Sequence, residues 1–307
     1  MNKVKLLNIT PLLISKNKWN KILSNIGIYG LLIIFGFVFI YPLVYMILTS
    51  LTPTEDVFNP LVNIVPSRIT FQNYAELLSR MDVWSSLGYS FFLTGVSSLL
   101  STLACGLMGY GLSRFNFKMK KFYLALVLIV FIIPTQVLVI PTFLTFAELN
   151  LLGSPLAFFI PAGLGQGFQS SIFILIFYSF FNTIPSALDE AAAIDGCSPW
   201  KTFIKIILPL SLPILTLVFI FSMVWYWNET YLMTLYLGDS SGTFINQVSV
   251  ALARLSVDAS QNPMGQQINL PIMMAAACLI IAPLLISYLF LQRQFVESVD
   301  KTGLTGE

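Results

Sequence analysis

The sequence predicts an all-α polytopic membrane protein with six transmembrane helices and both termini in the cytoplasm. First, 56% of the 307 residues are hydrophobic and only 10% are charged, whereas soluble domains carry roughly 25% charged residues. Second, six mostly apolar blocks reach the length of about 20 residues that a bilayer crossing requires. Third, the basic residues gather at one set of block ends. The predicted spans are 26–49, 87–112, 122–146, 157–181, 206–228 and 271–291.

The first span follows a basic segment, residues 1–25, and has to be distinguished from a signal peptide. Its apolar run is longer than the roughly 7–15 residues of a signal-peptide core. No small-residue cleavage site follows Tyr41-Pro42. We therefore expect a retained span, with 1–25 as a basic cytoplasmic N-terminal segment, 26–291 as the transmembrane domain and 292–307 as a cytoplasmic tail.

The distribution of Lys and Arg sets the orientation of these spans. Of the 16 Lys and Arg residues, only Arg68, Arg80 and Arg254 lie at the opposite set of ends. Because basic residues are retained on the cytoplasmic side, the loops at about 50–86 and 229–270 are expected outside. The polar stretch between the fourth and fifth spans is then cytoplasmic.

Prolines and amide side chains interrupt the apolar blocks. A proline inside a helix frees a carbonyl that neighbours or water must satisfy. Polar residues at this depth usually face the bundle interior or a cavity, so Gln166 and Gln169 are candidates for a substrate pathway. Helix–helix packing explains a single glutamine equally well. The carboxylates lie at or outside the span ends, which argues against a stand-alone carrier coupled through buried ionisable groups.

The composition also excludes several catalytic classes. The chain has no histidine, which removes a Ser-His-Asp triad and the commonest metal ligand. The three cysteines lack metal-binding or disulfide spacing. No Gly-Lys pair occurs, so there is no nucleotide-binding P-loop. We expect no catalytic residue, no metal and no cofactor on this chain, and any nucleotide must be handled by a partner.

Residues 186–209 form the longest charged, turn-prone interruption and predict a hairpin of two short helices. Ser186 and Asp189 offer capping oxygens before the first helix. The alanines at 191–193 favour helix and present a smooth surface. Gly196 permits the positive φ that ends this helix.

The second arm of the hairpin is expected to start at Ser198-Pro199, with proline at the first helical position. Phe203, Ile206 and Ile207 give this arm an apolar face. Pro209 is expected to break it from the following span. A compact polar hairpin at one face of a membrane protein indicates that another protein docks there.

The spacing of this hairpin resembles the EAA motif of ABC importer permeases, E-A-A-x3-G-x9-I-x-L-P. The chain carries the pattern without gaps at Glu190, Ala191, Ala192, Gly196, Ile206, Leu208 and Pro209. The resemblance implies the type I ABC importer permease fold.

Further features are similar to the carbohydrate-uptake branch of these permeases, in particular its second permease. They are the Asp195-Gly196 pair, the Pro209-x3-Pro213 run, the Trp-Asn-Glu run at 227–229 and the ending at 292–297. Ser298 stands where that ending usually has glycine. The resemblance covers about 85–307, and the segment before it matches only in kind.

The resemblance also implies roles for the hairpin residues. The coupling residues carried over are Glu190, Ala191, Ala192, Asp195, Gly196 and Pro209. The glutamate would pair with a basic residue in a cleft of the ATPase, the first two alanines would form the close contact surface, and the glycine would form the hinge.

The same resemblance implies a non-catalytic subunit of a membrane complex. Its partners would be a second paralogous permease, two ATPase subunits that bind ATP and Mg²⁺, and an extracellular or periplasmic solute-binding protein. The chain would be a multi-pass protein of the cell membrane and would not bind nucleic acid. The solute would be a sugar or oligosaccharide. A non-sugar solute such as a glycerol-phosphate compound, and less favourably a stand-alone carrier, stay open.

A dense aromatic and polar cluster ends the fifth span on its outer side. Aromatic faces stack on sugar C–H surfaces, but they also anchor helices at membrane interfaces or contact a binding protein. The residues expected along a substrate pathway are Trp225, Trp227, Asn228, Glu229, Gln166 and Gln169.

Overall fold

The computed structural model describes residues 11–303 except 54, 57–65, 80, 239–241, 247 and 249–269. At residues 11–23, 291 and 293–303 it describes the backbone only. All of its regular structure in these residues is helical. The principal helices are α1 (Pro11–Ser50), α2 (Gln72–Ser79), α3 (Val83–Arg114), α4 (Lys120–Ile132), α5 (Thr135–Glu148), α6 (Leu156–Gly163), α7 (Ser170–Thr183), α8 (Ala187–Ile194), α9 (Pro199–Thr202), the π-helical turn η2 (Phe203–Ile207), α10 (Leu208–Leu210), α11 (Leu212–Asn228), α12 (Tyr231–Leu237) and α14 (Leu270–Gly303).

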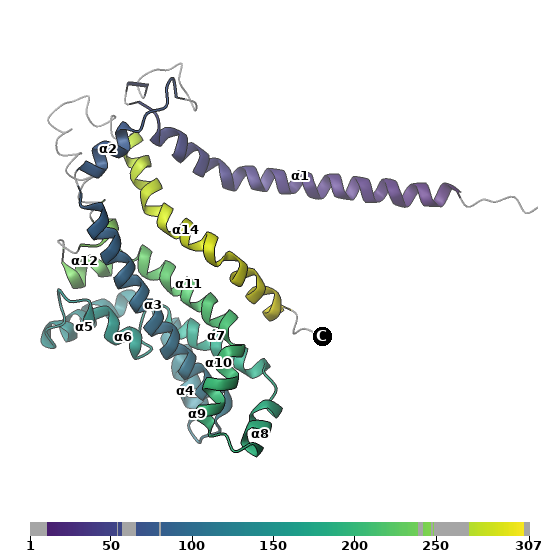
Figure 1. Cartoon of the computed structure of the whole chain (residues 1–307), viewed down its shortest axis with the longest axis vertical. Helices are drawn as coiled ribbons and strands as arrows, with labels where there is room; N and C mark the ends of the chain where they lie inside the picture. Colours follow the sequence, from purple (N-terminus) through teal and green to yellow (C-terminus); the bar gives the residue numbers. More distant parts are fainter. Residues whose placement is uncertain are drawn as a thin grey trace, which may run out of the picture.

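Among the residues that the structure describes, three helices are long and apolar enough to cross a membrane. They are the 24–50 part of α1, the whole of α3 and the 270–290 part of α14, and they overlap the predicted first, second and sixth spans. Bent pairs of shorter helices bring the number of candidate crossings to as many as six. In Figure 1, α1 runs outward from one end of the bundle, where its C-terminal part lies beside the start of α14.

The predicted span at 122–146 is two helices, α4 and α5, with a bend of 100° between them. Proline disfavours the helical conformation of the residue before it. Ile133 is accordingly extended, with φ −68° and ψ 123°, and Pro134 follows in the extended region. Pro141 lies inside α5, so of these two prolines only the one at 134 breaks the segment.

The predicted span at 157–181 also has a break, since residues 164–169 separate α6 from α7. Gly165 and Gln169 both have positive φ, 69° and 55°, and this left-handed conformation is uncommon for a residue other than glycine. The Tyr226 hydroxyl packs against Gly167, and the Tyr226 ring lies 4.6 Å from the Phe168 ring. A side chain from α11 therefore holds the break.

The predicted break at Pro209 is displaced to Ser211. The chain bends by 75° between the stretch Pro199–Leu210 and α11. Proline lacks the N–H for the normal helical bond, and its ring clashes with the carbonyl four residues earlier. The wider turn η2 accommodates Pro209, since the Leu208 N–H bonds to Phe203 O, five residues back. Pro213 in the first turn of α11 also lacks an N–H, and the bend falls between the two prolines.

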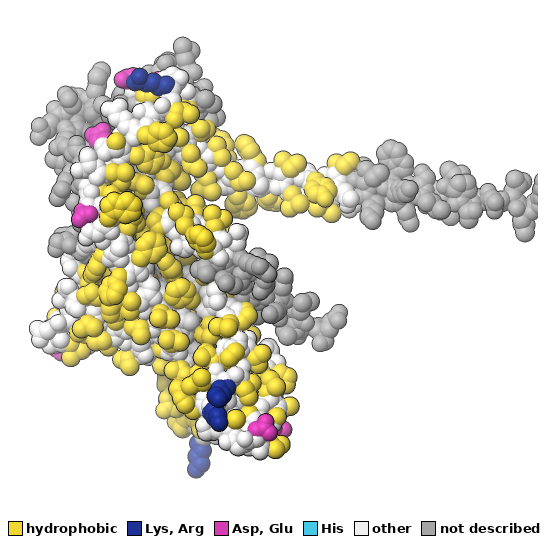
Figure 2. Space-filling view, in the orientation of Figure 1, with side chains coloured by type: hydrophobic (Ala, Val, Ile, Leu, Met, Phe, Trp, Pro, Cys, Tyr) yellow, Lys and Arg dark blue, Asp and Glu magenta, His cyan; other side chains and the backbone are white. Residues whose placement is uncertain are grey.

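The core is organised around α3, which packs against α7, α11 and α6. At Gly109 of α3 an added Cβ would lie 2.5 Å from Phe177 Cβ and 3.0 Å from the Tyr178 backbone nitrogen. Small residues permit such close approach between membrane helices. Hydrophobic side chains cover most of the face seen in Figure 2, and Lys and Arg side chains appear at its upper and lower ends. This pattern suits a bundle surrounded by lipid.

Candidate functional site

The first arm of the predicted hairpin is α8, and it begins without the cap that the sequence suggested. The Ser186 side chain makes no capping hydrogen bond. Its backbone carbonyl instead accepts from the N–H groups of Asp189 and Glu190, at 2.9 and 3.1 Å. Both acidic residues lie in the first turn, where negative charge complements the helix dipole.

The end of α8 confirms the predicted role of Gly196 in the turn. Gly196 has φ 75°. Its N–H donates to Ala193 O at 3.0 Å, and the Cys197 N–H donates to Ala192 O at 2.9 Å. These two hydrogen bonds are those of a Schellman motif, in which a residue in the left-handed conformation allows the last carbonyls of the helix to be paired. The turn between the two arms is therefore set by backbone hydrogen bonds.

The second arm begins as predicted. Ser198 Oγ accepts a hydrogen bond from the Lys201 N–H at 3.3 Å, and Pro199 occupies the first helical position. The Trp200 and Phe203 rings stack with centroids 5.7 Å apart. The buried Phe203 ring also lies 4.6 Å from the Tyr110 ring of α3, which anchors this arm to the bundle.

The predicted coupling residues occupy two environments. Glu190, Ala191, Asp195 and Gly196 are exposed, whereas Ala192 is only 3% exposed. The two motif alanines therefore do not share one outer surface. Pro209 is exposed but lies in α10, beyond the π-helical turn, so its place is to shape the arm that carries the tip.

Two apolar side chains at the tip were not among the predicted coupling residues. Ile194 is 87% exposed and Trp200 is 61% exposed. Exposed apolar residues amid polar ones mark an interaction surface when they form a contiguous patch. A lone isoleucine in the Ile-Asp-Gly-Cys-Ser-Pro-Trp sequence was the available signal. The tip combines a carboxylate with apolar side chains, which suits docking into a cleft of mixed character.

The two tryptophans at the C-terminal end of α11 face opposite sides of the helix. Trp225 is 49% exposed, whereas Trp227 is 3% exposed. The Trp227 Nε1–H donates to Ile280 O of α14 at 3.2 Å. Its ring lies 5.2 Å from the Phe91 ring of α3 and 6.4 Å from the Phe244 ring. Trp227 thus joins three separate segments, as a packing residue does.

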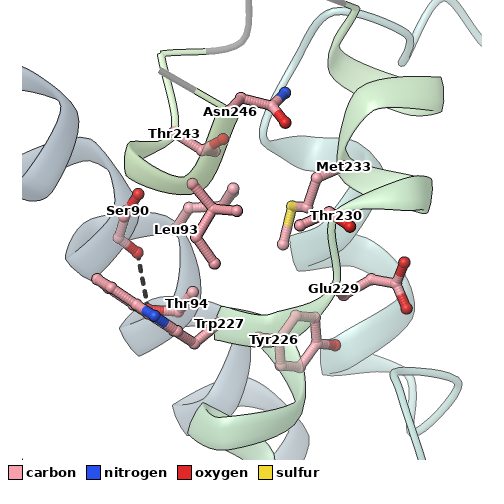
Figure 3. A pocket seen from close by; sticks show the side chains of 11 residues that line it. Ser90, Leu93, Thr94, Tyr226, Trp227, Glu229, Thr230, Met233, Thr243 and Asn246 are labelled. Atoms are coloured by element: carbon pink, nitrogen blue, oxygen red, sulfur yellow. Dashed lines mark hydrogen bonds between the residues drawn. The ribbon is translucent and has the colours of Figure 1, made fainter. Parts of the chain in front are cut away.

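The other predicted pathway residues do not form one group with the tryptophans. Asn228 Nδ2 donates to Val224 O of its own helix at 2.8 Å, and Glu229 Oε1 accepts from the Leu232 N–H at 3.0 Å. Gln166 and Gln169 lie in the break between α6 and α7. A small pocket between α3, α11 and α12 is lined by Trp227 and Glu229, together with residues such as Thr230 (Figure 3). The other four predicted residues are not in its lining.

Replacing Trp227 by phenylalanine should lower stability more than it alters transport selectivity. The change removes the hydrogen bond to Ile280 O and part of a buried ring, an expected loss of about 1–3 kcal/mol. Melting of the purified protein in detergent measures this, with Trp84→Phe as the matched control because Trp84 is 85% exposed. Unchanged melting together with altered solute selectivity would instead place Trp227 in the pathway.

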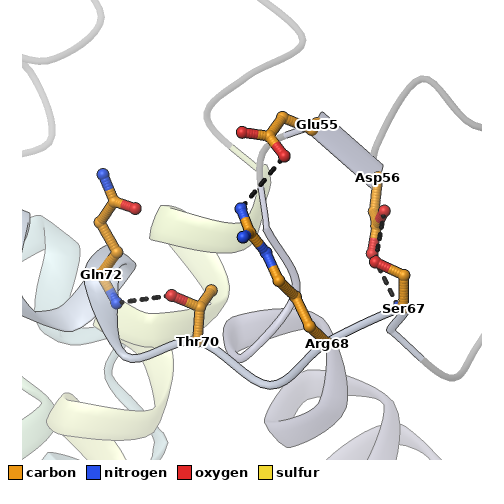
Figure 4. A network of polar contacts seen from close by, with 6 residues as sticks. All are labelled: Glu55, Asp56, Ser67, Arg68, Thr70 and Gln72. Atoms are coloured by element: carbon orange, nitrogen blue, oxygen red, sulfur yellow. Dashed lines mark hydrogen bonds and ion pairs between the residues drawn. The ribbon is translucent and has the colours of Figure 1, made fainter.

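Polar contacts organise the segment that follows α1 (Figure 4). Asp56 accepts hydrogen bonds from the Ser67 N–H and Oγ at 2.8 and 2.9 Å. Asn73 Nδ2 reaches back to Ser50 O and Thr52 O at 2.8 and 2.9 Å. These bonds fix α2 against the end of α1. This segment belongs to the loop at about 50–86 that is expected outside, and most of the other such loop, 229–270, lies outside the described residues.

A bundle of apolar helices with an exposed polar hairpin is the arrangement expected of a membrane permease. The chain matches the family of binding-protein-dependent transport system inner membrane components over residues 102–301. It therefore belongs to that family and is a membrane protein.

Two relatives match nearly the whole length of the chain. The polygalacturonan/rhamnogalacturonan transport system permease protein YtcP of Bacillus subtilis is 31% identical over 284 residues, covering 90% of this chain and 96% of that protein. The arabinooligosaccharides transport system permease protein AraQ of Halalkalibacterium halodurans is 30% identical over 294 residues, covering 95% and 100%.

A solved structure shares the fold. It is the crystal structure of a bacterial ABC transporter involved in the import of the acidic polysaccharide alginate, one chain of which aligns with a TM-score of 0.72 and 21% identity. The alignment covers 90% of this chain and 98% of that one. The predicted permease fold is thereby confirmed.

Proposed function

We propose that this chain is the transmembrane subunit of an ATP-driven, binding-protein-dependent importer of a sugar or oligosaccharide. The observation that carries the proposal is the hairpin, with Glu190 exposed on its first arm and a turn fixed at Gly196. A structure of this kind serves to receive force from another protein. Membership of the binding-protein-dependent transport family supports the same role.

The solute class is proposed from the relatives. The names of YtcP and AraQ refer to polygalacturonan or rhamnogalacturonan and to arabinooligosaccharides. A further relative, 27% identical over 267 residues, is a melibiose/raffinose/stachyose import permease of Bacillus subtilis. Each name refers to a carbohydrate, which supports carbohydrate for this chain as well.

In the proposed arrangement, six crossings place both termini and the hairpin in the cytoplasm. The bent pair of α4 and α5 makes the third crossing, α6 with α7 makes the fourth, and α10 with α11 makes the fifth. Residues 1–25 and 292–307 then form the cytoplasmic ends. The bias of Lys and Arg toward these ends supports this orientation.

The proposed complex contains a second permease, two ATPase subunits and a solute-binding protein. ATP and Mg²⁺ bind the ATPases, and the hairpin tip seats in a cleft of one of them. Closure of the ATPase dimer pushes the hairpin and switches the bundle between inward-facing and outward-facing states. Solute would pass near Trp225, Asn228, Glu229, Gln166 and Gln169, with Trp227 holding the helices around the path.

Labelling of Cys197 tests the placement on which this proposal depends. Cys197 is half-exposed in the hairpin, Cys105 is buried, and Cys278 is replaced by alanine to leave one reactive thiol. A membrane-impermeant maleimide should label inverted membrane vesicles and leave intact cells unlabelled. The same protein, carrying an affinity tag, should copurify with an ATPase. Labelling in intact cells would put the hairpin outside and overturn the proposal.

A further inference from the structure

The hairpin has few attachments through which a push on its tip could reach the bundle. Ala192 is the one buried residue of α8. In the described part of the chain, the helix packs mainly against α9, the other arm of the same hairpin. An exposed helix held only by the other arm of its hairpin would tilt when a partner protein pushes on it. The angle of α8 must therefore be set by specific polar contacts.

Arg114 supplies those contacts from the C-terminal end of α3. Its Nε lies 3.3 Å from Asp189 Oδ2 in the first turn of α8. Its Nη2 donates to Ile184 O at 2.8 Å, at the end of α7 just before the hairpin. The side chains of Arg114 and Asp189 are 13% and 28% exposed, so salt screens this pair less than a surface pair.

A guanidinium suits this position because its donors lie in a rigid plane. One side chain pairs by charge with the carboxylate on α8, without a hydrogen bond from Nε, and donates a hydrogen bond to the carbonyl that ends α7. A lysine ammonium, as a point charge on a flexible stem, would hold the two groups less firmly. The geometry at Arg114 therefore fixes the direction in which α8 leaves α7.

The second arm is held by the same end of α3. Tyr110, one turn before Arg114, contacts Phe203 of the second arm, with ring centroids 4.6 Å apart, and Phe181 of α7 at 5.5 Å. Both arms of the hairpin thus meet the last turns of α3. Because α3 packs along α7, α11 and α6, movement of this end reaches much of the bundle.

We propose that Arg114 is a positioning residue for energy coupling, and that α3 receives the hairpin's motion through it in addition to the covalent path into α11. This inference rests on the proposed function, because it assumes that the hairpin is pushed by an ATPase. The Arg114–Asp189 pair keeps α8 at a fixed angle, so that ATPase closure turns into helix movement instead of hairpin tilt.

Charge reversal in the reconstituted importer tests this role. Arg114→Glu and Asp189→Arg should each lower solute transported per ATP hydrolysed by roughly tenfold, a size usual for coupling between sites. ATPase copurification and hydrolysis should persist, since Glu190 itself is unchanged. The double variant, which restores the pair in reverse, should recover at least half of the wild-type ratio. Arg114→Lys should fall between wild type and Arg114→Glu.

Lys118→Glu is the matched control, because it makes the same charge change at an exposed residue just beyond α3. It should leave the transport ratio unchanged. A double variant as defective as either single variant, in an intact complex, would overturn the inference. So would a wild-type ratio in Arg114→Glu. Glu190→Lys separates the two proposals: if it also transports normally, the coupling role of the hairpin fails as a whole.

Discussion

Glu190→Lys is expected to leave the chain in the membrane while abolishing nearly all binding-protein-dependent transport. Glu190 is exposed in the first turn of α8, where a lysine loses a favourable dipole interaction of about 0.3–1 kcal/mol. The larger effect lies in the proposed ATPase cleft, where a like charge would face the basic partner. Loss of one member of a buried interfacial charge pair costs about 2–5 kcal/mol or more, which is roughly 30-fold to several thousand-fold in affinity.

Copurification of the ATPase and transport in proteoliposomes measure this effect. Glu190→Gln should give a smaller loss, because it removes the charge without reversing it. Glu148→Gln serves as the control, since Glu148 is an exposed carboxylate at the end of α5, and it should transport within about twofold of wild type, as surface substitutions usually do. Normal transport by Glu190→Lys in a fully assembled complex would contradict the role given to the hairpin tip.

Gly109→Ala is expected to destabilise the bundle, although alanine normally favours a helix over glycine. The new Cβ would lie 2.5 Å from Phe177 Cβ and 3.1 Å from the Phe177 backbone carbon. Because backbone cannot move aside as a side-chain end can, α3 and α7 must separate. Overpacking of this kind costs about 1–3 kcal/mol, and Gly109→Leu should cost more.

Gly111→Ala provides the matched control on the same helix, since no atom lies within 4 Å of its added Cβ. It should be neutral or stabilising by up to about 1 kcal/mol. The melting temperatures of the two variants in detergent, followed by size-exclusion chromatography, measure the difference in stability. Equal melting temperatures would mean that α3 and α7 do not approach at Gly109 as described.

The existence of the helices could be predicted because a bilayer crossing needs a long apolar run, and such runs are visible in the sequence. The bends in these helices were harder to predict from the sequence. Pro134 did mark a break, but the bend near Pro209 depends on how η2 and Pro213 share the strain. The break at 164–169 depends on Tyr226, which lies far away in the sequence.

The candidate site, too, could be predicted from the sequence only in part. The turn at Gly196 and the start at Ser198 follow from local capping chemistry, so the sequence predicted both. The burial of Trp227 could not be predicted, because α11 is apolar on all sides and periodicity assigns it no inner face. Arg114 and Asp189 are far apart in the chain, and no local pattern links them.

The contact between α1 and α14 has a consequence for biogenesis. Ribosomes deliver the first helix to the membrane long before the last, yet among the described helices α14 supplies most of the neighbours of α1. Until synthesis nears its end, α1 therefore lies in lipid without α14. Nascent chains truncated before residue 270 would therefore lack the contact that holds the C-terminal part of the first helix against the bundle.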